Sequence, residues 1–168
     1  MKKSEVSSRA VLFTVQGAMI AAIYVVLTLA FAPVSFGPIQ FRISEALVIL
    51  PYFTPAAVPG VFVGCLLSNI LGSGVVLDII FGSLATLIGA VFSYLLRKHK
   101  FLVCVPPIIS NVLIIPWVLR IAYGVPDMIP YLMFTVGIGE VLAIGGLGNL
   151  LLLALDKYKG VIFRTNAA

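Results

Sequence analysis

Long apolar stretches, separated by short polar or glycine- and proline-rich breaks, dominate the pattern of this chain. No Lys, Arg, Asp or Glu occurs from position 10 to 41, or again from position 46 to 77. A helix needs about 20 predominantly apolar residues to cross the hydrocarbon core of a bilayer. Each stretch is therefore long enough for one membrane span and a broken segment, and the pattern predicts transmembrane helices.

We predict six spans, because prolines, glycines and charged residues interrupt the apolar pattern five times. The predicted spans are Val11–Phe31, Ile43–Phe53, Ala57–Leu71, Asp78–Leu96, Leu102–Ile121 and Pro130–Leu155. The second is too short to cross about 30 Å of hydrocarbon at about 1.5 Å per residue. We expect it to be tilted, partly unwound or shielded by its neighbours. The chain, residues 1–168, is thus predicted to be a single all-α integral membrane domain, a bundle of six transmembrane helices.

Composition and charge support this fold class and give it an orientation. Of the 168 residues, 61% are hydrophobic and 10% are charged, whereas soluble domains carry about 25% charged residues. All but two of the 11 Lys and Arg residues lie at the termini or in the turn 97–100. This is the positive-inside pattern of a membrane protein and not a basic face that follows nucleic-acid phosphates. We therefore predict both termini to be cytoplasmic and the protein to lie in the cell membrane.

Once the termini and the turn 97–100 are set aside, every charged residue falls in the predicted outer half of the protein. An ionisable group inside a membrane costs at least about 2.5–3.5 kcal/mol and is a functional candidate by default. We expect an outward-facing polar cavity that binds a small molecule. Its candidate residues are Gln40, Arg42, Glu45, Asn69, Asp78, Asn111, Trp117 and Glu140.

Several of these residues also have a purely structural interpretation. Arg42 and Glu45 are three positions apart and could form a local ion pair. Asp78 follows a glycine-containing turn and could cap a helix. The two asparagines could hydrogen-bond between helices, and Trp117 could belong to an aromatic belt at the membrane interface. Glu140 has no such alternative, because it lies deep in a span with no cap or partner near it in sequence.

Small residues and missing motifs complete the prediction. Gly17 and Ala21, and beside them Ala18 and Ala22, recur at four-residue spacing on the first span. They could pack against another helix of the bundle, but we expect this flat face to dock a partner subunit. No phosphate-binding GxxxxGK[ST] loop, HExxH or GxSxG motif is present, and the two cysteines form no ligand cluster. We expect no enzyme activity, no cofactor and no metal, and instead a binding subunit that depends on a partner for energy.

Three stretches carry a resemblance to a known family. They are Gly37–Glu45 (GPIQFRISE), Ala57–Asn69 (AVPGVFVGCLLSN) and Asp78–Thr86 (DIIFGSLAT). Together with Pro106–Asn111 and the region of Glu140, they resemble the QueT family over nearly the whole chain. QueT proteins are substrate-binding S components of energy-coupling factor (ECF) transporters. The resemblance implies a six-helix fold, uptake of queuosine precursors, and docking on a membrane-embedded coupling subunit with two ATPases.

The resemblance also implies roles for the candidate residues. The substrate class is a 7-deazaguanine base, such as 7-aminomethyl-7-deazaguanine, or queuine. Glu140, and second Glu45, is expected to accept the two adjacent N–H groups of the guanine edge. Asp78 is expected to face a cationic aminomethyl group, Arg42 to hold Glu45, and Gln40, Asn69 and Asn111 to bind the carbonyl and ring nitrogens. An S component for another vitamin or base, a membrane enzyme and a purely structural subunit are the alternatives.

Overall fold

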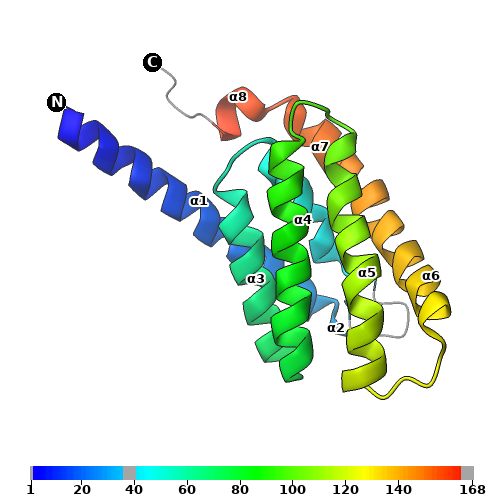
Figure 1. The fold of residues 1–168 in the computed structure, drawn as a ribbon. Coiled ribbons are helices and arrows are strands. Elements are labelled where there is room, and N and C mark those ends of the chain that lie inside the picture. Colours follow the sequence, from blue (N-terminus) through cyan, green and yellow to red (C-terminus); the bar gives the residue numbers. More distant parts are fainter. Residues whose placement is uncertain (1, 36–40, 164–168) are drawn as a thin grey trace.

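The computed structural model describes residues 2–35 and 41–163, with side chains from residue 7 onward, and these residues contain helices and no strand. Gln40 lies outside the described residues. Figure 1 shows the helices side by side around a central short element, with α1 leaving the bundle at an angle. In chain order the elements are α1 (Lys2–Ala30), α2 (Ala32–Ser35), η1 (Ile43–Tyr52), α3 (Ala57–Gly72), η2 (Asp78–Gly82), α4 (Ser83–Leu95), η3 (Leu102–Cys104), α5 (Val105–Ala122), α6 (Ile129–Glu140), η4 (Val141–Gly148), α7 (Asn149–Asp156) and α8 (Lys159–Ile162).

Four helical stretches are long and apolar enough to cross a membrane. They are Ser7–Ala30, Asp78–Leu95, Leu102–Ala122 and Ile129–Asp156. The other two predicted spans correspond to shorter apolar helices, Ile43–Tyr52 and Ala57–Gly72. The prediction of an all-helical protein with several candidate membrane spans is confirmed, whereas crossing six times stays a prediction.

The short second element, η1, is a 3₁₀ helix surrounded by other helices. Every residue from Ser44 to Pro51 is buried, and η1 contacts η4, α4, α1 and α3. Because a 3₁₀ helix rises about 2.0 Å per residue, its ten residues extend about 20 Å, more than an α-helix of equal length would. Shielding by neighbours was one of the three expectations for this element, and it is the one the structure shows.

Glycines allow the helices to approach closely at two contacts. Along α3, a Cβ on Gly60 would lie 2.9 Å from the Gly17 carbonyl oxygen, and a Cβ on Gly64 would lie 2.7 Å from the Tyr24 Cβ. Between α4 and α5, a Cβ on Gly89 would lie 2.5 Å from the Cα of Pro107. Small residues thus bring backbones together, as expected where the lipid gives no hydrophobic drive for helix association.

The small-residue face predicted for partner docking divides between two sides of α1. Gly17 and Ala21 pack against α3, since a Cβ on Gly64 would meet Ala21 Cα at 3.1 Å. Ala18 and Ala22 are exposed on the other side of the helix. Docking stays a prediction, and the two alanines are the part of the face that remains available for it.

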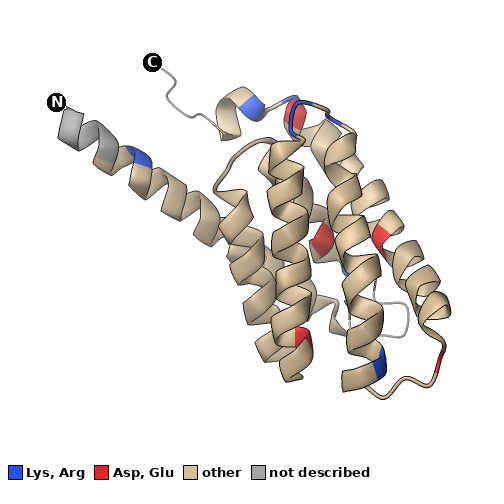
Figure 2. Ribbon diagram, viewed as in Figure 1, with Lys and Arg blue, Asp and Glu red and all other residues tan. Residues whose placement is uncertain are grey.

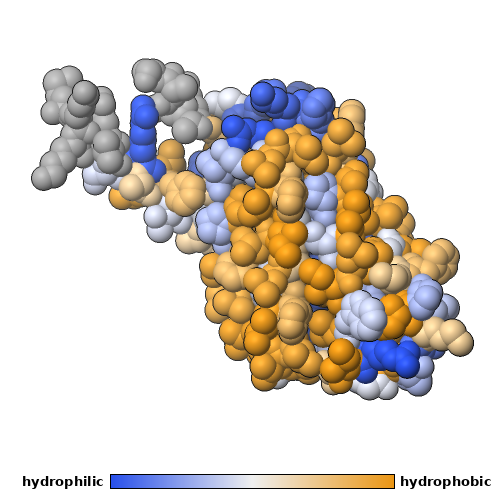
Figure 3. All heavy atoms as spheres, in the orientation of Figure 1, coloured by the Kyte–Doolittle hydropathy of each residue, from blue (hydrophilic) through white to orange (hydrophobic). Residues whose placement is uncertain are grey.

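The surface is apolar around the helices and charged at its ends. Figure 3 shows an orange apolar face over most of the bundle and a blue hydrophilic end near α8. At this end, Lys100 Nζ lies 2.6 Å from Asp156 Oδ2, and Lys159 Nζ lies 3.0 Å from Asp156 Oδ1. The first ion pair ties the turn after α4 to the end of α7, and the second joins the end of α7 to the beginning of α8.

Replacing Gly89 with alanine tests the close contact between α4 and α5. The added methyl must displace the Pro107 backbone, so we expect Gly89→Ala to lower stability by about 1–3 kcal/mol, seen as a lower thermal unfolding temperature in detergent. Gly137→Ala is the matched control, because its Cβ would lie at an ordinary 3.5 Å from Val112 Cγ2. Equal unfolding temperatures for the two variants would contradict the contact.

Candidate functional site

A buried ion pair lies between the beginning of η1 and the beginning of η2. Arg42 Nη2 lies 3.4 Å from Asp78 Oδ2, and both side chains are almost fully buried. The hydroxyl of Tyr123 donates to the same Asp78 oxygen at 3.0 Å. Burial, with Asp78 beside it, raises the pKa of Tyr123, so that its hydroxyl keeps its proton and acts as a donor. Asp78 is therefore held by two donors from outside its own helix.

The second buried acid, Glu45 of η1, is held by hydroxyl groups. The hydroxyl of Tyr24, from α1, donates to Glu45 Oε1 at 2.5 Å, and the Thr86 hydroxyl, from α4, lies 3.5 Å from the same oxygen. The neighbouring residue Ser44 bonds to Thr28 of α1 at 2.7 Å. Glu45 is only 1% exposed. Its position is thus fixed by contacts from two other elements, α1 and α4, although the i,i+3 spacing suggested Arg42 as its partner.

Asn69 of α3 connects the part of the cluster around Asp78 with the part around Glu45. Its side-chain nitrogen donates to the Asp78 carbonyl oxygen at 3.1 Å and lies 3.6 Å from Cys65 Sγ, which in turn lies 3.3 Å from the Thr86 hydroxyl. Gly82 makes this arrangement possible, because a Cβ there would lie 2.9 Å from Asp78 Oδ1 and 3.1 Å from Asn69 Nδ2.

The third buried acid, Glu140, lies near Glu45 and Asn111. The Asn111 side chain is close enough to affect both carboxyl groups, and the charge of Glu45 acts on Glu140. Glu140 is 5% exposed at the end of α6. Residues far apart in the sequence, on η1, α5 and α6, therefore meet at one place in the bundle.

Two of the three acids lie where the backbone changes from one helix type to another. Asp78 is the first residue of η2, and Glu140 immediately precedes η4, and both of these segments have π-helical hydrogen bonding. π-Helical turns are rare and occur frequently at functional sites. Figure 2 shows acidic segments inside the bundle, on the central element and on α6. The wider turn alters the direction of side chains near the junction, which brings these acids to the interior.

The cluster presents buried hydrogen-bond acceptors that nothing in the described part of the chain satisfies. They are Glu45 Oε2, Asn69 Oδ1, Asp78 Oδ1 and Glu140 Oε2. Buried polar atoms are almost always paired in native proteins, and each exception needs an explanation. All four atoms are oxygens of carboxyl or carboxamide groups, so the arrangement suits a ligand that brings several N–H or O–H donors.

A family model matches most of the chain. The model of the family described as QueT transporter matches residues 14–157, which contain every described residue of the cluster. The chain belongs to the QueT transporter family. This confirms the resemblance seen in the sequence, and the family name points to a transporter and not to an enzyme.

A curated relative carries the same family name. The QueT-family chain is 42% identical over 73 residues to the queuosine precursor transporter QueT of Lactococcus lactis subsp. cremoris (strain MG1363). The aligned part is 42% of this chain and 43% of the relative, so it spans less than half of either protein. No solved structure matches the chain.

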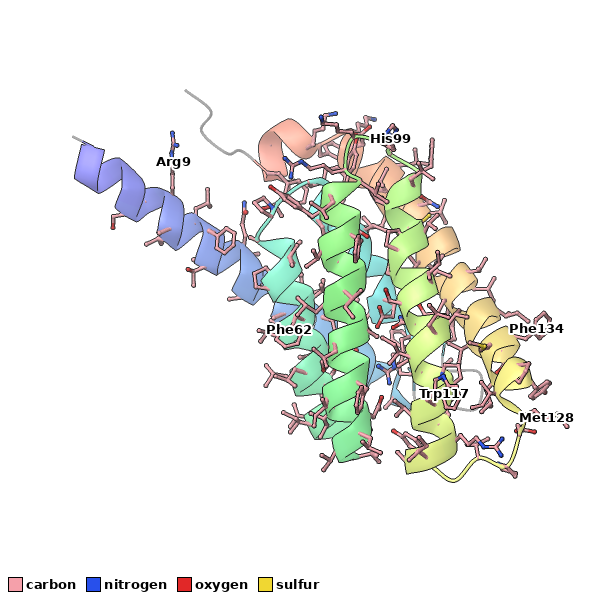
Figure 4. The ribbon with its side chains drawn as sticks, viewed as in Figure 1. Arg9, Phe62, His99, Trp117, Met128 and Phe134 are labelled. Atoms are coloured by element: carbon pink, nitrogen blue, oxygen red, sulfur yellow. The ribbon has the colours of Figure 1, made fainter. Side chains whose placement is uncertain are left out.

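The structure brings together most residues that the sequence of this QueT-family member singled out. Arg42, Glu45, Asn69, Asp78, Asn111 and Glu140 form the cluster. Trp117 is 52% exposed and instead lines an apolar groove of about 290 Å³ with Leu77, Phe81 and Leu113. Figure 4 shows it on α5, apart from the labelled Phe134 and Met128. Its role in binding stays a prediction.

Tyr24, Thr86 and Tyr123 were not among the candidate residues predicted from the sequence. Tyr24 lies in a long apolar span, where an aromatic side chain is usually interpreted as a core residue. Its hydroxyl nevertheless needs a partner when it is buried. Four-residue spacing with Thr28 was the available signal, because it places two hydroxyl groups on one side of α1.

Within the described residues, no group of three or more His, Cys, Asp or Glu side chains is arranged for a metal.

Removing the Tyr24 hydroxyl tests how Glu45 is held. We expect Tyr24→Phe to lower the free energy of unfolding by about 1–3 kcal/mol, because it leaves a buried carboxyl oxygen without its strongest donor. Tyr131→Phe is the control, since Tyr131 is 56% exposed. Thermal or denaturant unfolding in detergent measures both, and an unchanged midpoint for Tyr24→Phe would show that the hydrogen bond contributes nothing.

Proposed function

We propose that this QueT-family protein is the substrate-binding S component of an ECF importer for a queuosine precursor, a 7-deazaguanine base or queuine. The family match and the name of the Lactococcus relative support the substrate class. The observation that carries the proposal is the set of buried acceptor oxygens on Glu45, Asn69, Asp78 and Glu140 that have no partner among the described residues. A purine-like base with several N–H groups supplies the donors that these oxygens lack.

The proposed binding mode starts from the guanine edge of the ligand. This edge offers two adjacent N–H donors, which one carboxylate can accept side by side in a geometrically specific pair of bonds. Glu140 has an unpartnered Oε2 and lies beside the Asn111 amide, so it is our choice for this contact. Asn69 and Asn111 carry both donors and acceptors and can bind the carbonyl and ring nitrogens.

Six crossings with both termini in the cytoplasm of the cell membrane are part of the proposal. The basic turn 97–100 and α8 lie at one end of the bundle, and Figure 4 places the labelled Arg9 and His99 toward this end. Exposed Arg120, in the last turn of α5, donates to the Asp127 carbonyl oxygen of the following loop at 2.9 Å, at the other end of the bundle. The positive-inside rule then places the first end inside and the loop outside.

Energy for transport comes from partners in this proposal, namely a membrane-embedded coupling subunit and two ATPases. The sequence contains no phosphate-binding loop of its own. Ala18 and Ala22 are exposed on α1, and Figure 1 shows the N-terminal part of this helix extending beyond the other helices. This face is our candidate for docking the coupling subunit.

Ligand binding to purified protein tests the proposed function. We expect 7-aminomethyl-7-deazaguanine or queuine, but not unrelated vitamins, to raise the thermal unfolding temperature. Glu140→Gln should weaken binding by about tenfold or more, since a hydrogen bond to a charged group contributes about 1.5–3 kcal/mol. Asp127→Asn is the control, because it makes the same change from a carboxyl group to an amide in an exposed loop. This variant should bind the ligand like the unaltered protein. An affinity change within about twofold for Glu140→Gln would refute its role.

A further inference from the structure

An apolar groove lies between η2 and α5 on the surface of the bundle. All of its lining residues are hydrophobic, and they include Phe81 of η2 and Leu113 and Trp117 of α5. These three side chains are exposed, and Figure 4 shows the labelled Trp117 on α5. Both walls are formed largely by candidate membrane spans, Asp78–Leu95 and Leu102–Ala122. The apolar group that reaches this groove is therefore an acyl chain of a surrounding lipid.

The length of the groove matches one leaflet of a bilayer. On α5 the groove extends from Leu113 to Ile121, and a separation of eight residues at about 1.5 Å each gives about 12 Å. One leaflet contributes half of a hydrocarbon core that is about 30 Å thick. Because α5 ends at Ala122, the groove starts at the end of the span and runs toward the middle of the bilayer. An acyl chain that lies in it places its headgroup beside the end of α5.

A cation lies at this end of the groove. Arg120 follows Leu113 and Trp117 at spacings that place the three side chains on one side of α5. One of its N–H groups donates to the Asp127 carbonyl oxygen at 2.9 Å, and its remaining donors have no partner in the described part of the chain. It is the one exposed Lys or Arg that the structure describes at this end, since the others lie near the basic end of the bundle or on α1, as Figure 2 shows in blue. A guanidinium binds phosphate through paired N–H donors.

We infer that this groove binds an anionic phospholipid, with one acyl chain along Phe81 and Trp117 and the phosphate on Arg120. Arg120 contacts the backbone oxygen of Asp127 and not its carboxylate, so its charge remains available to a headgroup. A zwitterionic headgroup carries a cation of its own next to the phosphate, and Arg120 therefore favours an anionic lipid. The lipid site is separate from the buried acids, and the inference does not depend on which substrate the protein transports.

Trp117 makes lipid binding directly measurable, because it is the only tryptophan of the chain. The protein is reconstituted in phosphatidylcholine vesicles that contain a fixed mole fraction of lipid brominated on its acyl chains, and the quenching of tryptophan fluorescence is recorded. We expect brominated phosphatidylglycerol to occupy the groove about fivefold more strongly than brominated phosphatidylcholine, since one basic residue attracts an anionic lipid by about this factor. A preference of less than about twofold would overturn the inference and leave only contact with bulk lipid.

Substitution of Arg120 tests the phosphate contact. Arg120→Gln should abolish the preference for phosphatidylglycerol and leave quenching by phosphatidylcholine unchanged, because the apolar walls of the groove stay in place. Arg97→Gln makes the same change in the exposed turn at the other end of the bundle, and this control should keep the preference. An undiminished preference in Arg120→Gln would show that Arg120 does not bind the phosphate. If Arg120→Gln does not fold, the comparison of the two lipids on the unaltered protein decides the question alone.

Discussion

The buried ion pair between Arg42 and Asp78 is the interaction around which the described site is arranged. A guanidinium inside an apolar bundle needs a counter-charge, because removing either partner leaves an uncompensated charge in a medium of low dielectric constant. The pair joins the beginning of η1 to the beginning of η2 at 3.4 Å. Glu45 lies three residues after Arg42 and is also inside the bundle. There its carboxyl group contacts the hydroxyl groups of Tyr24 and Thr86.

Departures from α-helical geometry bring the other acids to the same place. η1 is a 3₁₀ helix with its central residues buried, and η2 and η4 are π-helical segments next to Asp78 and Glu140. Regular α-helices would direct these side chains differently, since each helix type rotates successive residues by its own angle. Glycines at the contacts, Gly82 beside Asp78 and Gly148 against Ile49, leave the space for this packing. Local backbone irregularity and buried charge thus occur together.

Much of the fold and of the cluster could be predicted from the sequence, because the cost of placing charge in a bilayer leaves few places for it. The apolar pattern predicted the helices, and the rarity of acids within it singled out Glu45, Asp78 and Glu140. Sequence spacing could not assign partners, since it suggested a local pair of Arg42 with Glu45 while the fold joins Arg42 to a residue of another element. The contact of the Tyr24 hydroxyl with Glu45 was not predicted, because an aromatic residue in an apolar span is equally well explained as part of the hydrophobic core.

The proposed site combines the buried ion pair of Arg42 and Asp78 with two further buried acids, Glu45 and Glu140. Each of these glutamates has one carboxyl oxygen without a partner in the described residues, which suits a ligand that brings N–H donors. Exposed Trp117 and its apolar groove offer a competing place for a flat base. An experimental structure of the protein with bound 7-aminomethyl-7-deazaguanine distinguishes the two. We predict the base among η1, α5 and α6, with Glu45 and Glu140 oxygens about 3 Å from its donors. A base stacked on Trp117 in the groove, away from both glutamates, would contradict this account.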